Sequence, residues 1–305
     1  MTRQIVHVKE TKWVYIELPS SSDIRFLRKN YPFHPVDIEE FGVRQQRPKI
    51  DVFPSYIHLI LHFPLFHGKN QKLMTSEVHF FAGKNFLVTV HDGQTHSLST
   101  LFDRCYKNKR TASSLLSKGV AQLLYSILDA GVDDTIAILD EVSINLEYMD
   151  RQVFEADSKA IVEEISLLRR NIIYFQTILK PQIPLFNSLE KGQIKLLNGQ
   201  LSAYWGTIVD RTNRMWDRLE DAHELIEGLF ATNESLVQFR TNEVIKVLTI
   251  FSVMLMPLTL LSGIYGMNLI SLPLANHPQS FLFVSFLMLL VTLGMILFFR
   301  FKKWL

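Results

Sequence analysis

The loss of acidic side chains toward the C-terminus constrains this chain more than any other feature. No aspartate or glutamate follows Glu243 in the 305 residues. Residues 247–264 and 281–299 are uncharged, strongly apolar runs of 18 and 19 residues. A helix rises ~1.5 Å per residue, so each run nearly matches the ~30 Å hydrocarbon core of a bilayer. We therefore expect a two-helix transmembrane hairpin, against the alternative of two buried core helices.

Basic residues flank the two runs and predict how they are oriented. These residues are Arg240, Lys246, Arg300, Lys302 and Lys303. The loop between the runs, residues 265–280, has no lysine or arginine. Because positive side chains favour the cytoplasmic side, we expect an outer loop over 265–280, a basic cytoplasmic tail over 300–305 and both termini in the cytoplasm. The expected location is the inner (plasma) membrane of the cell, with the lipid bilayer as a partner.

Residues 1–115 mix the patterns of strands and short helices. Runs rich in β-branched and aromatic residues predict strands over 4–8, 13–18, 50–53, 56–63, 76–81 and 86–91. Short helices are expected over 23–29 and 35–41. We interpret this region as a cytoplasmic α/β domain with an antiparallel or mixed sheet. His58 and His62 would share one strand face, where histidines are more often core or surface residues than metal ligands.

The pattern turns helical after this domain. Residues 116–202 form a cytoplasmic helical region, with helices expected over 132–154 and 161–179 and a break at Pro181 and Pro184. From residue 203 an apolar stripe with near-heptad spacing runs into the first apolar run, and no proline interrupts it before Pro257. We expect one long stalk helix over 203–264 that continues into the first span. At ~1.5 Å per residue it would be ~90 Å long, far more than a bilayer needs.

Charge excludes one class of partner and suggests another. The whole chain carries a net charge of +2, so a strongly basic nucleic-acid binder is excluded and no nucleic acid is expected as a partner. Residues 133–240 hold 18 acidic and 11 basic side chains, a net charge of −7. This is either the solvated face of long helices or a set of carboxylates that bind divalent cations between subunits. The candidate ligands on the stalk are Asp210, Asp217, Asp221 and Glu224.

A short motif at the outer end of the first run has a specific context. Tyr265-Gly266-Met267-Asn268 precedes a short loop, a last apolar run and a basic tail. With the stretches HPVDIEE (34–40), RPKI (47–50) and FLVTVH (86–91), it resembles the CorA family of magnesium transporters across essentially the whole chain. The resemblance implies a funnel-shaped homopentamer whose first membrane helix lines a pore. It also implies that Mg²⁺ is the substrate, and the negative charge of the helical region predicts that Mg²⁺ is a regulatory ligand as well. No organic cofactor is expected, and no enzymatic activity, because no Ser/His/Asp set or carboxylate pair can be argued for catalysis.

Counting back from the motif places seven residues on one side of the first membrane helix. They are Asn242, Ile245, Leu248, Ser252, Met256, Thr259 and Gly263. The family resemblance places Asn242, Leu248, Met256 and Thr259 at pore-lining positions, and Gly266, Met267 and Asn268 in the selectivity motif. The alternative for this face is an ordinary packed helix surface.

The outer loop departs from the family pattern. Ile270 and Leu274 stand where family members often carry acidic residues, so cations are less concentrated at the mouth. The leading hypothesis is passive influx of hydrated Mg²⁺, with Co²⁺ or Ni²⁺ as further substrates. A transporter of Zn²⁺ or another transition metal on the same scaffold is the first alternative. A membrane-anchored divalent-ion sensor that conducts nothing is the second.

Overall fold

The chain divides into two compact units, Met1–Phe230 and Ala231–Leu305, in a computed structural model. The residues that the structure describes are 3–39, 41, 46–68, 72–153, 159–197, 202–267, 273 and 278–304.

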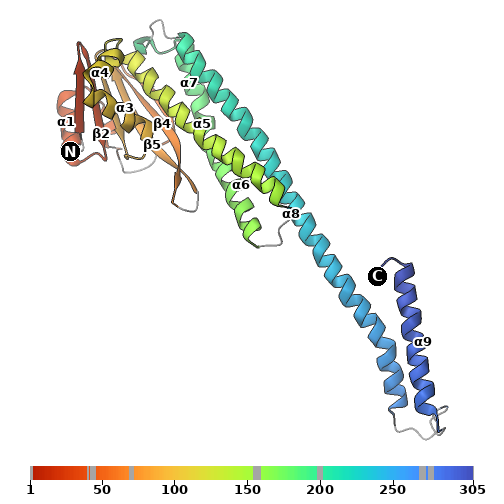
Figure 1. Ribbon diagram of the computed structural model, residues 1–305. Coiled ribbons are helices and arrows are strands. Elements are labelled where there is room, and N and C mark those ends of the chain that lie inside the picture. The colour runs from red at the N-terminus through yellow and green to blue at the C-terminus, as the bar shows by residue number, and fades with distance from the viewer. Residues whose placement is uncertain are drawn as a thin grey trace. The chain divides into compact units, whose positions relative to one another are not determined.

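A six-stranded mixed sheet is the framework of the first unit (Figure 1). Its spatial order is β1-β2-β6-β5-β4-β3, and the pair β2–β6 is parallel while the other described pairs are antiparallel. The mixed sheet agrees with the expected α/β domain. The strands are β1 (Arg3–Val8), β2 (Thr11–Glu17), β3 (Lys49–Val52), β4 (Tyr56–His67), β5 (Lys72–Gly83) and β6 (Phe86–His91).

Helices cover both faces of this sheet. On one face, Leu27 of α1 and Ile38 of α2 join a buried cluster with Val14 and Val88 of the sheet. On the other face, the ring of Phe102 in α3 contacts Trp13 in an edge-to-face arrangement, with centroids 5.0 Å apart. The helices of this unit are α1 (Ser21–Asn30), α2 (Pro35–Glu39), α3 (His96–Lys107), α4 (Lys109–Leu116), α5 (Val120–Gln152), α6 (Lys159–Leu179), α7 (Ile183–Glu190), the short 3₁₀ helices η1 (Lys180–Gln182) and η2 (Lys195–Leu197), and the first part of α8 (Ser202–Tyr265).

The long strands β4 and β5 extend past their neighbours, and side-chain amides complete their free edges. The pairing of β3 with β4 ends at Ile60, so His62 lies on an uncovered edge. The backbone N–H of His62 donates to Gln182 Oε1 (3.2 Å), and its carbonyl accepts from Gln182 Nε2 (3.0 Å). The backbone N–H of Leu73 in β5 donates to Asn171 Oδ1 (3.0 Å). Because a buried backbone group without a partner costs free energy, these amides fix how α6 and η1 dock on the sheet.

α5 and the first part of α8 run side by side beyond the sheet (Figure 1). The apolar stripe predicted on α8 is buried in this unit from Ile208 to Leu229. Arg211 on α8 donates to Asp129 Oδ1 on α5 at 2.7 Å and also pairs with Asp133 one turn further along. The stripe supplies the apolar contact, and the arginine fixes the register between the two helices.

The second unit contains the end of α8 and the helix α9 (Ser280–Phe301), which runs antiparallel to it (Figure 1). The most apolar 18-residue stretch of α8 has a mean hydropathy of 2.2, and 6% of it is buried within the chain. The corresponding stretch of α9 has a mean hydropathy of 2.7, and none of it is buried. Both helices are long and apolar enough to cross a membrane. α8 starts one residue before the expected stalk helix and ends one residue after it.

The helical part begins earlier than the sequence patterns indicated. α3 and α4 were not expected, and α5 begins at Val120 rather than at residue 132. The first turns of α5 pack against several elements and are apolar on most sides, so they show no clear helical period. α2 ends at Glu39, short of the expected 41. The break expected at Pro181 and Pro184 is confirmed, because α6 ends at Leu179 and each proline lies in the first turn of a new helix, η1 or α7.

Candidate functional site

The seven residues predicted to line a pore all lie exposed on α8 in the single chain. Met256 has 71% of its surface exposed, and Ile245 and Leu248 are also exposed apolar side chains. They are distributed along the helix at intervals of three or four residues, so they share one side. Contiguous exposed apolar groups mark a surface that meets lipid or another protein chain.

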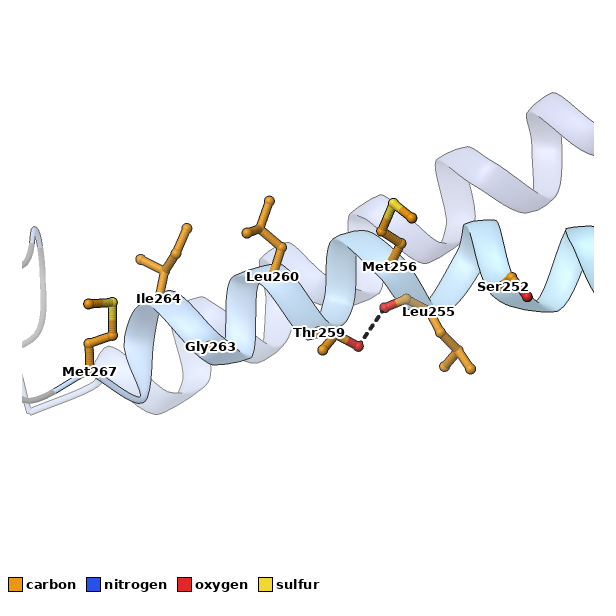
Figure 2. A pocket seen from close by; sticks show the side chains of 8 residues that line it. All are labelled: Ser252, Leu255, Met256, Thr259, Leu260, Gly263, Ile264 and Met267. Carbon is orange, nitrogen blue, oxygen red and sulfur yellow. Dashed lines mark hydrogen bonds between the residues drawn. The ribbon is translucent and has the colours of Figure 1, made fainter.

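An open groove of about 770 Å³ follows this side of α8 (Figure 2). Four of the predicted residues line it, namely Ser252, Met256, Thr259 and Gly263. The other lining residues are apolar neighbours on the same helix: Leu255, Leu260, Ile264 and Met267. The structure therefore groups the part of the predicted face nearest the motif into one surface, which extends to Met267.

The hydroxyl groups of this surface are held by the helix backbone. Thr259 Oγ1 donates to the carbonyl of Leu255 and Ser252 Oγ to that of Leu248, each at 2.9 Å (Figure 2 shows the first of these bonds). A hydroxyl that donates in this way keeps its oxygen lone pairs free to accept. Both oxygens can therefore accept hydrogen bonds from water molecules, including those that surround a cation.

The motif begins where α8 ends. The backbone N–H of Gly266 donates to the carbonyl of Ser262 at 2.8 Å, and that of Met267 to Ile264 at 3.3 Å. A Cβ atom at position 266 would lie 2.9 Å from the Ser262 carbonyl oxygen, closer than such contacts occur. Gly266 does not have a positive φ. Glycine is therefore required here because a side chain would come too close to the backbone of the preceding helical turn.

Three residues on which the sequence analysis relied lie outside the described residues. They are Asn268 of the motif and the two outer-loop positions Ile270 and Leu274. Met267, the last described residue before the loop, is an exposed side chain.

The four candidate carboxylates of the stalk are separate from the groove. Asp210, Asp217, Asp221 and Glu224 are all exposed on the part of α8 in the first unit. Among the described residues of one chain, no group of three possible metal ligands includes any of them. The group that does occur there consists of Asp37, Asp51 and His58, which the sequence analysis did not select.

Comparison with known proteins identifies the family. The sequence profile described as CorA-like Mg²⁺ transporter protein matches residues 8–303. The chain belongs to this family. The cobalt/magnesium transport protein CorA of Thermotoga maritima is 28% identical over 276 residues, which cover 90% of this chain and 78% of that one. The protein of the same name from Methanocaldococcus jannaschii is 22% identical, over 96% of this chain and 90% of that one.

Solved structures agree on the fold. The complete structure of the CorA magnesium transporter from Methanocaldococcus jannaschii matches with a TM-score of 0.85 and 21% identity, covering 98% of this chain and 94% of that one. The CorA-type architecture of an α/β domain, a long helix and two C-terminal apolar helices is therefore confirmed. The chain is a membrane transport protein of a divalent-cation family and not an enzyme, with Mg²⁺ as the ion that the family description gives.

Proposed function

We propose that this chain forms a homopentameric pore for passive influx of hydrated Mg²⁺, with the seven-residue face of α8 lining the pathway. The observation that carries the proposal is the exposure of this face, with its groove, in a chain of the CorA family. Two helices are too few to enclose an aqueous pathway within one chain, so several copies must surround an axis. Co²⁺ and Ni²⁺ are further candidate substrates.

The motif residues suit an ion that keeps its water. Mg²⁺ dehydrates reluctantly, and a ring of Asn268 amide oxygens accepts hydrogen bonds from its bound waters without removing them. A neutral ring also avoids holding the ion too tightly to release it. Further inside, the hydroxyls of Thr259 and Ser252 offer the same kind of acceptor. The membrane potential drives entry, at ~2.3 kcal/mol per charge per 100 mV.

Two apolar rings form the gate in this proposal. Met256 and Leu248 lie on the same face as the hydroxyls, and both side chains are exposed in the single chain. Around an axis they would form a narrow apolar segment, and such segments block hydrated ions by losing water until they widen.

The basic residues around the spans favour one orientation. Both termini and the α/β domain lie in the cytoplasm, and the loop after the motif faces outward, in the inner (plasma) membrane.

Internal Mg²⁺ then reaches the carboxylates of the stalk. Because residues 133–240 carry a net charge of −7, subunits repel one another until divalent ions bind between them. Bound Mg²⁺ therefore favours a closed assembly, which gives negative feedback as a population shift. Protease protection of the purified protein with and without millimolar Mg²⁺ tests this, and equal cleavage rates would remove the feedback.

Flux into liposomes tests the pore. We expect Asn268→Ala to abolish Mg²⁺ flux while the oligomer still assembles. Gly266→Ala should do the same, because its Cβ would lie 2.9 Å from the Ser262 carbonyl. Gly294→Ala on α9 is the matched control, since a Cβ there meets open space and flux should be unchanged. Flux at the wild-type level from assembled Asn268→Ala protein would refute the assignment of the motif.

The outer loop supports one alternative. Ile270 and Leu274 replace the acids that the family often carries, which leaves transport of Zn²⁺ or another transition metal as a second candidate. Fluorescent indicators for Mg²⁺ and for transition metals in the same liposomes separate the two. Liposomes that admit neither kind of ion would favour the non-conducting sensor.

A further inference from the structure

Three possible metal ligands meet on one face of the sheet in the first unit. A carboxylate oxygen of Asp37, a carboxylate oxygen of Asp51 and a ring nitrogen of His58 all lie within 4.8 Å of one another. The residues belong to α2, β3 and β4. None of them is part of the α8 groove or of the stalk carboxylates, so this group is distinct from the proposed pore and its proposed regulation.

Strand register and one hydrogen bond hold the three side chains together. β3 and β4 pair with Asp51 directly opposite His58, so both side chains project from the same face. α2 covers that face, and the Tyr56 hydroxyl on β4 donates to Asp37 Oδ2 at 3.0 Å. The His58 ring also stacks on Phe81, with centroids 4.1 Å apart. The ligand positions are therefore set by packed secondary structure.

A hydrogen-bonded chain behind His58 engages one of its two ring nitrogens. His79 Nε2 lies 2.7 Å from Glu77 Oε1, and His79 Nδ1 lies 3.1 Å from His58 Nε2. His58 Nε2 is therefore used within this chain of contacts, and Nδ1 is the ring nitrogen that remains for a ligand.

His58 Nδ1 faces a carboxylate oxygen. This nitrogen is buried without a hydrogen-bond partner, and Asp37 Oδ1 lies 3.5 Å away. The two side chains are 0% and 6% exposed, so water does not screen them. A buried polar atom without a partner costs free energy, and a cation between Nδ1 and Oδ1 would contact both atoms. Two ligands about 2.1 Å from a tetrahedral ion lie roughly 3.4 Å apart, which matches this separation.

We propose that Asp37, Asp51 and His58 bind a divalent transition-metal ion such as Zn²⁺ or Co²⁺. An imidazole nitrogen with two carboxylates suits these ions, whereas Mg²⁺ prefers oxygen ligands alone. A proton on Nδ1 that is shared with Asp37 is the competing explanation, and a metal titration distinguishes the two. Asp51 is 40% exposed, and its Oδ2 lies 2.9 Å from Lys49 Nζ, so an ion that enters from solvent replaces this lysine at the carboxylate. Glu77, acting through His79, orients the His58 ring.

Cobalt binding to the purified full-length protein in detergent tests this site. The protein is stripped of metal with a chelator and titrated at neutral pH with Co²⁺ alone, and the visible absorption of the bound ion is recorded. We expect Asp51→Asn to weaken this binding by at least about tenfold and Glu77→Gln, which loosens the outer partner, by about 10–100-fold. Asp103→Asn is the matched control, because it changes another exposed aspartate of the same unit and should keep wild-type binding.

Asp51→Asn decides the question, because an exposed position is substituted without disturbing the core. Cobalt held elsewhere on the protein, including the pore, persists in this variant, so the difference spectrum reports the proposed site alone. Equal cobalt affinity and absorption in wild type and Asp51→Asn would overturn the proposal. A cobalt spectrum that excess Mg²⁺ removes would also overturn it, since the site would then lack nitrogen selectivity. The readout does not depend on transport, so its failure and a failure of the pore proposal are separate results.

Discussion

A cysteine at Thr259 should react from the aqueous phase with a charged, membrane-impermeant thiosulfonate, and the adduct should block Mg²⁺ flux. Thr259 lies on the exposed groove of α8, within residues 247–264. A lipid-facing position excludes a charged reagent, whereas a water-filled pore admits it. The experiment therefore distinguishes a pore-lining face from a lipid-facing face. The exposure of a side chain in a single chain cannot make this distinction, because both kinds of face are exposed there.

The wild-type chain should show little labelling in this assay. Its one cysteine, Cys105, is buried in the first unit, and burial raises the pKa of its thiol to about 11. An accessible thiol with a pKa near 8.5 holds roughly 300-fold more thiolate at neutral pH, and the thiolate is the reacting form. Wild-type protein should therefore remain essentially unlabelled during the time that Thr259→Cys needs to react fully.

Leu261→Cys is the matched control at the same depth. Two residues along a helix correspond to a rotation of ~200°, so Leu261 lies on the side of α8 opposite to Thr259. Its labelling should fall to the Cys105 background. Ser252→Cys and Met256→Cys extend the test, because reactivity should return every three or four residues. Equal labelling rates at 259 and 261, or labelled Thr259→Cys protein that still conducts, would refute the assigned face.

Three further outcomes are expected. Gly131→Ala places a Cβ 2.2 Å from Phe63 Cε1 and should destabilise the protein by about 1–3 kcal/mol in thermal denaturation, with partial recovery when Phe63→Leu is added. Burial lowers the pKa of His91 to about 4. The unfolded chain, with a histidine pKa near 6.5, binds the proton first, so stability should fall by up to about 3 kcal/mol as pH drops from about 6.5 to 4, and His91→Gln should flatten this dependence. Met256→Ser should let water into the apolar ring and raise the leak of Mg²⁺ at high internal Mg²⁺. An unchanged leak in both Met256→Ser and Leu248→Ser would show that the gate lies elsewhere.

The sequence predicted those elements whose physical signature is local. α8 was located within one residue at each end because an apolar stripe, an uncharged run and the absence of an early proline all coincide. The strands were found because β-branched and aromatic residues concentrate there. The starts of β4 and β6 were predicted at Tyr56 and Phe86, whereas the free edge of β4 at His62 is completed by Gln182, 120 residues away. No local pattern contains such a partner.

The Asp37–Asp51–His58 group also depends on contacts between residues that are distant in the sequence. His58 was interpreted as an ordinary strand histidine, because a single imidazole in a strand is most often structural. Its distinguishing feature is a buried Nδ1 without a hydrogen-bond partner, 3.5 Å from Asp37 Oδ1, while Nε2 contacts His79. The pattern that could have indicated this group is the strand register, because Asp51 and His58 lie opposite each other once β3 and β4 form a hairpin. Strand order and pairing, which the sequence analysis did not predict, were needed to use it.

α8 changes its surroundings along its length. From Ile208 to Leu229 one apolar stripe is buried within the chain's own first unit. Along the apolar run from residue 247, apolar side chains are exposed on most sides, as lipid requires. Between these parts, Val237 and Phe239 are exposed. Apolar surface in water costs free energy, so in the proposed homopentamer we expect a neighbouring copy of the stalk to cover these two side chains. The same symmetry would bring the Thr259 and Met256 positions of several copies around one axis.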